Sequence, residues 1–374
     1  QEGHTLDHGF QVLLTSYPMA KKHLDYEALK LQYFKPGAVL FTNGKGYSLG
    51  DPLRDASLLF PTIFSNAVSF GDKLKIFRLN RELKKKTLEE IFDTPELSTL
   101  SYLKNYGFSN EAIANFFTPF FSGIFLEPKL ETSSRMFEFV YKMFGEGKAA
   151  IPAEGIKAIP LQIKEQLSHT KFSFSTPVDK VEEGKITLKN GEIIPSHLTI
   201  VATEASGLIP NLRNQESEWR SCDTLYFETN DRIIQGDLIG LITNPDALIN
   251  NIAYNLNTEQ KTNTLSVTIV KDHSYSEKEL IEKVQEELNT LCRIENCRFL
   301  KRYQINKALP KLQNLKYSLP PSETKINSTV FLAGDVLLNA SLNAAMLAGE
   351  QAANGVISLL EESPDLDFLI SEYL

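Results

Sequence analysis

The residues from Thr329 to Gly355 constrain the fold of this 374-residue chain more than any other stretch. An apolar run, Val330 to Ala333, predicts a short buried strand, which Gly334-Asp335 ends. Asn339 and Ser341 then offer side chains that cap a helix N-terminus. The expected helix can lie close against another backbone, because very small residues recur four apart in it, in the rows Ala345, Gly349, Ala353 and Ala344, Ala348, Ala352.

A strand, a Gly-Asp break and a helix of small residues form a ligand site in open α/β folds. Ligands there bind beyond the carboxyl ends of the strands, and helix N-termini attract negatively charged oxygens. The Asp335 carboxylate offers acceptors for ligand hydroxyls, and the amides from Leu342 to Ala345 offer donors for a ligand oxygen. The alternative is a strand-helix hairpin that packs through its alanines and binds nothing.

Composition excludes several classes of protein. A net charge of −8 argues against nucleic acid as the main partner. The three cysteines form no CxxC pair, which indicates a reducing compartment and no disulfide framework. No cluster of Cys and His has the spacing of metal ligands, so we expect no metal site.

The N-terminus shows no signal peptide, and no run of about 18 apolar residues predicts a membrane span. The closest apolar stretch, Ala56 to Phe70, is interrupted by Pro61. We expect a cytoplasmic protein, with peripheral contact to a membrane through such a stretch as an open alternative.

Four short motifs follow one another along the chain. They are Asp7-His-Gly-Phe-Gln11, Pro119-Phe-Phe-Ser-Gly123, Val201-Ala-Thr203 and Ala333-Gly-Asp335. In this order they resemble the superfamily of FAD-dependent amine oxidases, phytoene desaturases and protoporphyrinogen oxidases. The resemblance spans nearly the whole chain, and the order of the motifs is more specific than any single one.

The resemblance implies an FAD site. Asp335 would hold the ribityl-pyrophosphate part of FAD, and the start of the following helix would face the pyrimidine side of the flavin. Gly9 would lie beneath the flavin, Gln11 would approach its ring, and the backbone of Val178 would contact the adenine. The cofactor-binding residues implied are therefore Gly9, Gln11, Val178, Ala202, Thr203, Gly334, Asp335, Ser341, Leu342, Asn343 and Ala344.

One part of the family pattern is missing. Family members carry a strand-GxGxxG-helix unit ahead of the Asp-x-Gly motif, where it binds the FAD pyrophosphate. The chain contains no GxGxxG, and Asn43-Gly-Lys-Gly46 predicts a hairpin turn instead. We interpret the chain as a family member that lacks this N-terminal unit.

The expected fold class is α/β, with mixed α+β character. A Rossmann-like FAD-binding layer, incomplete at its N-terminus, would be interleaved with a substrate domain of helices and a β-sheet. Residues 1–14, 150–205 and 319–374 would form the FAD-binding domain, and residues 15–149 and 206–318 the substrate domain.

The implied function is FAD-dependent removal of a hydride from a substrate. The aromatic run from Phe116 to Phe125 indicates either core packing or the lining of an apolar cavity, which would fit a hydrophobic, tetrapyrrole- or carotenoid-like substrate. Two alternatives stay open: a non-catalytic relative that acts as a binding or scaffold protein, and a member of the amine oxidase branch. Lys307 and Tyr303 are candidates for a place beside the flavin, although a surface lysine is the simpler interpretation. The sequence specifies no catalytic residue, electron acceptor or oligomeric state.

Overall fold

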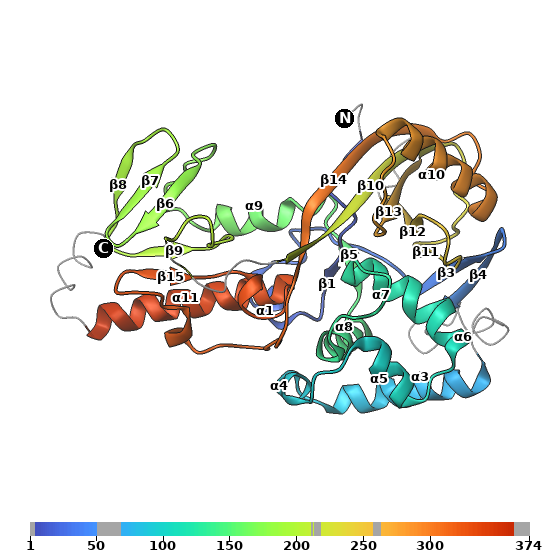
Figure 1. Ribbon diagram of the computed structural model, residues 1–374, viewed down its shortest axis with the longest axis horizontal. Coiled ribbons are helices and arrows are strands. Elements are labelled where there is room, and N and C mark those ends of the chain that lie inside the picture. The colour runs from blue at the N-terminus through green and yellow to red at the C-terminus, as the bar shows by residue number, and fades with distance from the viewer. Residues whose placement is uncertain (1–3, 51–68, 211, 213–217, 257–262, 363–374) are drawn as a thin grey trace. The chain divides into compact units, whose positions relative to one another are not determined.

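The computed structural model describes residues 4–50, 69–210, 212, 218–256 and 263–362. The chain forms two compact units (Figure 1), each assembled from separate segments. The first unit contains Gln1–Tyr17, His23–Gln166 and Trp219–Leu309, and the second contains Pro18–Lys22, Leu167–Glu218 and Pro310–Leu374. These divisions differ from the domain boundaries expected above, which stay a prediction.

A mixed sheet of seven described strands forms the centre of the first unit. In spatial order they are β14 (Arg298–Lys311), β10 (Glu218–Thr229), β13 (Asn263–Ile269), β12 (Ile249–Tyr254), β11 (Ile239–Ile242), β3 (Gly37–Thr42) and β4 (Lys45–Gly50). β11 and β3 run parallel, whereas β3 and β4 form the predicted antiparallel hairpin. Asn43 and Gly44 both have positive φ, at 52° and 71°, as the two-residue turn of such a hairpin requires.

The two faces of this sheet differ in chemistry because side chains alternate along a strand. One face is apolar: Leu225 and Phe227 of β10 and Val267 of β13 are fully buried, in one core cluster with residues of helix α10 (Glu277–Cys292). The other face carries Thr224 and Tyr226 of β10, with polar neighbours on β13 and β12. α10 begins with a capping box, since Ser276 and Glu279 each accept a hydrogen bond from the other's backbone N–H.

A helical layer precedes the long strands in the same unit. Its helices are α3 (Phe70–Lys85), α4 (Leu88–Asp93), α5 (Thr99–Tyr106), α6 (Asn110–Ala112), a π-helical turn (Ile113–Phe117), α7 (Thr118–Phe125) and α8 (Ser134–Glu146). Phe117, Phe121 and Phe125 are at most 1% exposed, so these aromatic residues form core. Phe117 and Phe121 pack with Phe137 of α8, and Phe125 packs with Phe121. Phe116 and Phe120 are only half-buried and stack on one another at 6.0 Å.

Three short strands and one helix complete the first unit. β1 (Leu13–Leu14) and β2 (Gln32–Tyr33) flank β5 (Ala149–Ile151), and α9 (Ala158–Glu165) follows β5 along the chain. Gly155 lies in the turn between β5 and α9, with φ at +85°.

The second unit is built around two parallel strands, β9 (Thr199–Val201) and β15 (Val330–Leu332). A separate antiparallel sheet of β6 (Val178–Glu182), β7 (Lys185–Leu188) and β8 (Ile193–Pro195) precedes β9. After β15 come a 3₁₀ turn (Asp335–Leu337) and α11 (Leu342–Glu362), as the sequence pattern predicted. The unit also contains most of α1 (Pro18–His23) and a 3₁₀ turn at Pro321–Thr324.

One of the two small-residue rows of α11 carries its packing. Ala344, Ala348 and Ala352 are completely buried, and the first two lie in a cluster with Met19, Leu319 and Leu338. The other row, Ala345, Gly349 and Ala353, does not pack in this cluster, and a Cβ added at Gly349 would meet nothing within 4 Å. Only one of the two rows therefore uses its small residues for close packing.

Among the helices that the structure describes, none combines the length and apolar character needed to cross a bilayer.

Candidate cofactor site

The carboxyl ends of β9 and β15 lie at the same edge of their parallel pair. Leu332 stands opposite Val201 in register, and the amide of Ala333 donates to the carbonyl of Val201 at 2.9 Å. The residues that follow each strand, Ala202-Thr203 and Gly334-Asp335, therefore leave the pair side by side. Two motifs separated by about a third of the chain meet here, as the resemblance implied.

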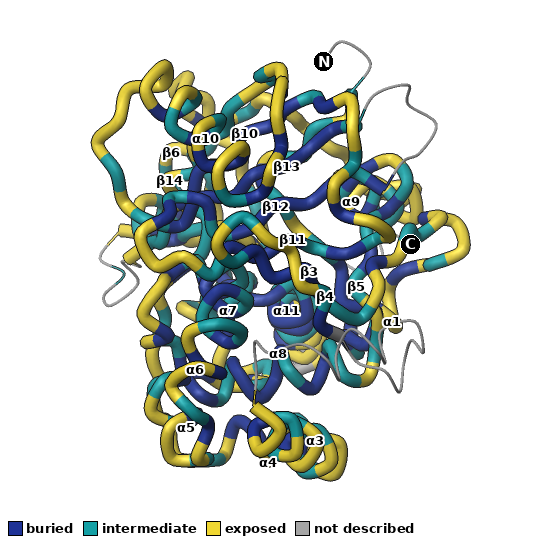
Figure 2. Tube along the Cα trace, turned by 90° about the vertical axis from the view of Figure 1, so that its right-hand side faces the viewer, coloured by how far each residue is buried: buried dark blue, intermediate teal, exposed yellow. Residues whose placement is uncertain are grey.

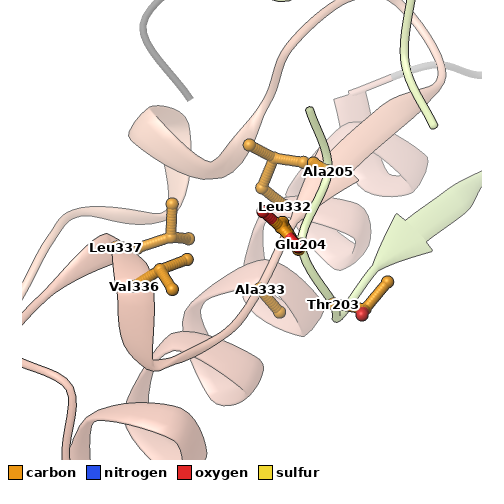
Figure 3. Close-up of a pocket in the computed structure, with 7 residues that line it drawn as sticks. All are labelled: Thr203, Glu204, Ala205, Leu332, Ala333, Val336 and Leu337. Carbon is orange, nitrogen blue, oxygen red and sulfur yellow. The ribbon is translucent and has the colours of Figure 1, made fainter. Parts of the chain in front are cut away.

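A small cavity lies at this edge (Figure 3). It has a volume of about 10 Å³, which is room for about one water molecule. Thr203, Glu204 and Ala205 line it from the segment after β9, and Leu332, Ala333, Val336 and Leu337 line it from β15 and the turn beyond. Ala202 and Thr203 are exposed, so the end of β9 is open to a larger ligand.

Gly334 and Asp335 make the turn that ends β15. Gly334 adopts φ +131° and ψ 162°, a backbone conformation that residues with a Cβ rarely adopt. The carboxyl of Asp335 is partly buried, and this burial raises its pKa above the ordinary value despite hydrogen bonds from the amides of residues 335 and 336. A carboxyl in this state gains from hydroxyl donors, and the ribityl hydroxyls of FAD are such donors.

The start of α11 presents backbone donors. Ser341 Oγ accepts from the amide of Ala344 at 3.0 Å and donates to Asn339 Oδ1 at 2.7 Å, so both predicted capping residues take part. The first amides of a helix have no partner inside the helix, which leaves those of Leu342 and Asn343 available to an acceptor. The approach to the helix is fixed by Ala340, which adopts a positive φ of 58°.

Asn343 ties this helix start to α1. Its Oδ1 accepts from the amide of Met19 at 3.0 Å, and its side chain is fully buried. Its Nδ2 has no hydrogen-bond partner among the described residues. Sequence reasoning assigned only the backbone of Asn343 to a ligand, and the contact with α1 links positions 324 residues apart, which no local pattern reveals.

Val178 opens β6, in the separate three-stranded sheet. It is partly buried against a cluster that includes Val201 and Val330, the core residues of β9 and β15. The structure thus places nine of the eleven predicted residues in the second unit, where the two strand ends, the Gly-Asp turn and the helix start follow one another closely.

Gly9 and Gln11 belong to the first unit. Gly9 is buried with φ +101°, and a Cβ there would lie 2.9 Å from Ile305 Cδ1, so the position requires glycine. Gln11 is exposed. The resemblance implies a place beneath the flavin for Gly9, but no local pattern reveals that Ile305 of β14 lies beside it.

Asp7 joins this N-terminal segment to the turn before α9. Its carboxylate accepts from the amide of Ile156 at 3.2 and 3.3 Å, and a Cβ on Gly155 would lie 2.9 Å from Asp7 Oδ1. Burial raises the pKa of the Asp7 carboxyl, although the Ile156 amide and nearby His8 oppose the shift. The Asp7–Ile156 hydrogen bonds therefore join two segments of the first unit that are 149 residues apart in the sequence.

Comparisons with known proteins agree with this geometry. The chain matches the family model "Flavin containing amine oxidoreductase" over residues 1–357. No curated protein sequence matches it.

Solved structures show the same fold at low identity. Putrescine oxidase bound to putrescine is 16% identical with a TM-score of 0.66, covering 94% of this chain and 88% of that one. Cyclohexylamine oxidase from Brevibacterium oxydans IH-35A is 14% identical with a TM-score of 0.68, covering 97% and 90%. An oxidoreductase from Methanosarcina mazei is 13% identical with a TM-score of 0.63, covering 88% and 84%.

The residues at the end of β9 and β15 fit FAD. A dinucleotide offers phosphate oxygens to helix amides and hydroxyls to carboxylates, and the amides of Leu342 and Asn343 and the carboxyl of Asp335 match these groups. The unpartnered Asn343 Nδ2 adds a buried donor at the same helix start. With the match over residues 1–357, this chain belongs to the family of flavin-containing amine oxidoreductases and is an FAD-dependent oxidoreductase.

Proposed function

We propose that the protein oxidises an amine that carries an apolar body, by removing a hydride from the carbon next to nitrogen. Bound FAD supplies the hydride acceptor. The family to which the chain belongs is described by amine chemistry, and structural neighbours include oxidases of putrescine and of cyclohexylamine. Nothing in these comparisons supports the tetrapyrrole or carotenoid substrate expected from the sequence, whereas they favour the amine oxidase alternative.

The observation that carries the proposal is the polar face of the seven-stranded sheet, which we define as Thr224, Tyr226, Ser266, Thr268 and Asn251. These side chains are at most 8% exposed and stand opposite one another in register, Tyr226 with Ser266 and Thr224 with Thr268, which in turn faces Asn251. A sheet face packed only to stabilise a core would be apolar, like the face that packs on α10. Five polar residues at consecutive cross-strand positions therefore indicate a face built to meet polar groups.

Two segments of the first unit cover the polar face. The N-terminal segment lies against it, because Tyr226 Oη donates to the carbonyl of Asp7 at 2.8 Å and a Cβ on Gly9 would lie 3.8 Å from Thr224 Oγ1. Helix α7 approaches at Gly123, where a Cβ would lie 2.9 Å from Asn251 Oδ1. The polar face thus adjoins Gly9, the residue expected beneath the flavin.

Thr224 supplies an acceptor that the fold leaves unused. Its side chain is completely buried, and its hydroxyl has no hydrogen-bond partner among the described residues. Leaving a buried hydroxyl unpaired costs about 1–3 kcal/mol, so folds keep such groups where a ligand or water completes them. An amine N–H is a donor that complements this oxygen, whereas a hydrocarbon polyene has none.

The apolar body of the substrate would pack on aromatic side chains of the same unit. Phe116 and Phe120 are half-buried, and Phe120 contacts Phe144 edge-on at 5.3 Å. These rings lie on the side of the π-helical turn and α7 that the fully buried Phe117 and Phe121 do not occupy. Half-buried rings bind apolar groups without the loss of a core contact.

The test is anaerobic reduction of the FAD-loaded protein. Primary alkylamines and cycloalkylamines are expected to bleach the flavin absorption near about 450 nm and to yield the imine or its hydrolysis product. An acyclic conjugated polyene of similar size serves as the matched non-amine. Bleaching by the polyene and by none of the amines would refute the proposal and restore the desaturase alternative.

A further inference from the structure

Helix α3 has two faces with opposite character. Its inner face is anchored in the first unit through Asp72, Leu79 and Leu83, each at most 1% exposed. Its outer face carries Phe70, Leu74 and Phe77, which are 76%, 56% and 56% exposed. We call these three residues the outer apolar row; Figure 2 colours much of α3 as exposed or intermediate.

The outer apolar row is a continuous surface and not three scattered residues. The spacing of four and then three places the side chains on one side of the helix, one above the other. Removing water from two phenylalanines and a leucine is favourable, because each side chain has a large apolar surface. Contiguous exposed apolar side chains of this size mark surfaces that bind something.

Basic residues continue the same side of the helix. Arg81, Lys84 and Lys85 follow the outer apolar row by one to two turns and are exposed. α3 as a whole carries six basic and two acidic residues, in a protein whose net charge is −8. Positive charge is therefore concentrated on this helix against the overall charge of the chain, which favours an anionic partner.

Hydrogen bonds on the inner face anchor α3 in the first unit at both ends of the helix. Ser69, the N-cap, donates to Asp72 Oδ2 at 2.6 Å, and Ser109 donates to the same carboxylate through its amide and its hydroxyl at 3.0 and 2.7 Å. Burial opposes the charge on Asp72, but these hydrogen bonds, with one from Lys75, lower its pKa to about 2. At the other end, Lys142 Nζ donates to the carbonyl of Leu83 at 2.9 Å.

We propose that α3 binds the surface of an anionic lipid bilayer. The helix would lie in the plane of the interface, with Phe70, Leu74 and Phe77 among the upper acyl chains and Arg81, Lys84 and Lys85 against lipid phosphates. An anionic bilayer surface complements both features at once, a short apolar row and a basic cluster on the same helix side. Binding at the interface needs no membrane-spanning helix.

The experiment is flotation of the FAD-loaded protein with vesicles of phosphatidylcholine, with or without phosphatidylglycerol. The protein is expected to float with the anionic vesicles, at least about tenfold more than with the zwitterionic ones, and to be released by salt. The double variant F70S/F77S is expected to lose about tenfold or more of this binding, and so is the variant R81Q/K84Q/K85Q.

Two matched controls exist on exposed positions elsewhere. F174S removes an aromatic ring that is 70% exposed in the second unit, and K278Q removes a lysine whose side chain is 87% exposed on α10. Both should float like the unchanged protein, and circular dichroism should show all variants folded.

Three outcomes would overturn the proposal. The first is the absence of flotation with anionic vesicles, and the second is equal flotation of the folded α3 variants. The third is a change of oligomeric state in F70S/F77S without any vesicle binding by the unchanged protein, which would assign the outer apolar row to a second copy of the chain. None of these outcomes depends on the substrate, so the proposed function stands or falls separately.

Discussion

The edge formed by β9 and β15 and the polar face of the seven-stranded sheet differ in how the chain builds them. The edge uses short contiguous motifs, small residues and backbone groups, with Gly334, Asp335 and Ser341 within eight positions. The polar face uses alternate side chains of β10, β12 and β13, which pair across strands far apart in sequence. An edge built from backbone groups and contiguous motifs is therefore visible in the sequence, whereas a face built from side chains of several strands appears only after the strands are paired.

The largest expected effect lies at the edge. Replacing Gly334 with valine forces a side chain into φ +131°, which costs about 1–3 kcal/mol and displaces Asp335. We expect the affinity for FAD to fall about a hundredfold, measured by flavin titration. Gly349→Ala on α11 is the control, because a Cβ there meets nothing within 4 Å. If both variants bound FAD equally well, the edge would not be the cofactor site.

The Asp7–Ile156 pair offers the next largest effect, this time on stability. Gly155→Ala places a Cβ 2.9 Å from Asp7 Oδ1 at φ +85°, whereas Gly191→Ala meets no atom within 4 Å at φ +86°. The strain of a left-handed backbone, about 1–2 kcal/mol, is common to both variants. Urea unfolding should therefore show that the free energy of unfolding of Gly155→Ala is about 1 kcal/mol lower than that of Gly191→Ala. Equal losses would mean that the Asp7 contact contributes nothing.

Asp335 should show a smaller, pH-dependent effect. Its folded pKa is raised above the ordinary 3.8, so ionisation opposes folding, and flavin-free protein should lose this stability as pH rises from about 4 through the folded pKa. Asp335→Asn cannot ionise, so it should not show this loss of stability. Its free energy of unfolding should therefore rise relative to that of the unchanged protein as pH rises, while its affinity for FAD falls. A constant difference in urea midpoint between pH 3 and 7 would contradict the assignment.

The smallest effect is expected on the polar face. Thr224→Val removes one hydroxyl and keeps the shape of the side chain. We expect kcat/KM for an amine to fall about two- to tenfold, which corresponds to the free energy of one hydrogen bond. Thr229→Val on the opposite face of β10, where the hydroxyl donates to the carbonyl of Asp231, should alter stability and leave kcat/KM unchanged. The reverse result would place substrate recognition elsewhere.

Local chemistry explains what the sequence could predict. The strand at Val330, the cap at Ser341 and the turn at Asn43-Gly44 each depend on neighbours within four residues, and the structure confirms them. The assignments of individual residues to FAD stay predictions, because proximity to a strand end does not itself show a contact with a cofactor.

The features that could not be predicted depend on contacts between residues far apart in the sequence. The aromatic run from Phe116 to Phe125 divides into a buried and a half-buried side only because a π-helical turn at Ile113–Phe117 sets its phase, and no local signal predicted that turn. The contact of Asp7 with Ile156 spans 149 residues. Thr224 is recognised as part of a polar sheet face only when its neighbours on β13 are known.

The contact between Asp7 and Ile156 also sets an order of events during synthesis of the chain. At about 5–20 residues per second, a ribosome needs roughly 10–30 s to add the 149 residues that separate Asp7 from its partner, and longer to reach Tyr226. During this time the segment around Gly9 has been made but has neither of these partners. The burial of this segment is therefore delayed until those later residues have left the ribosome.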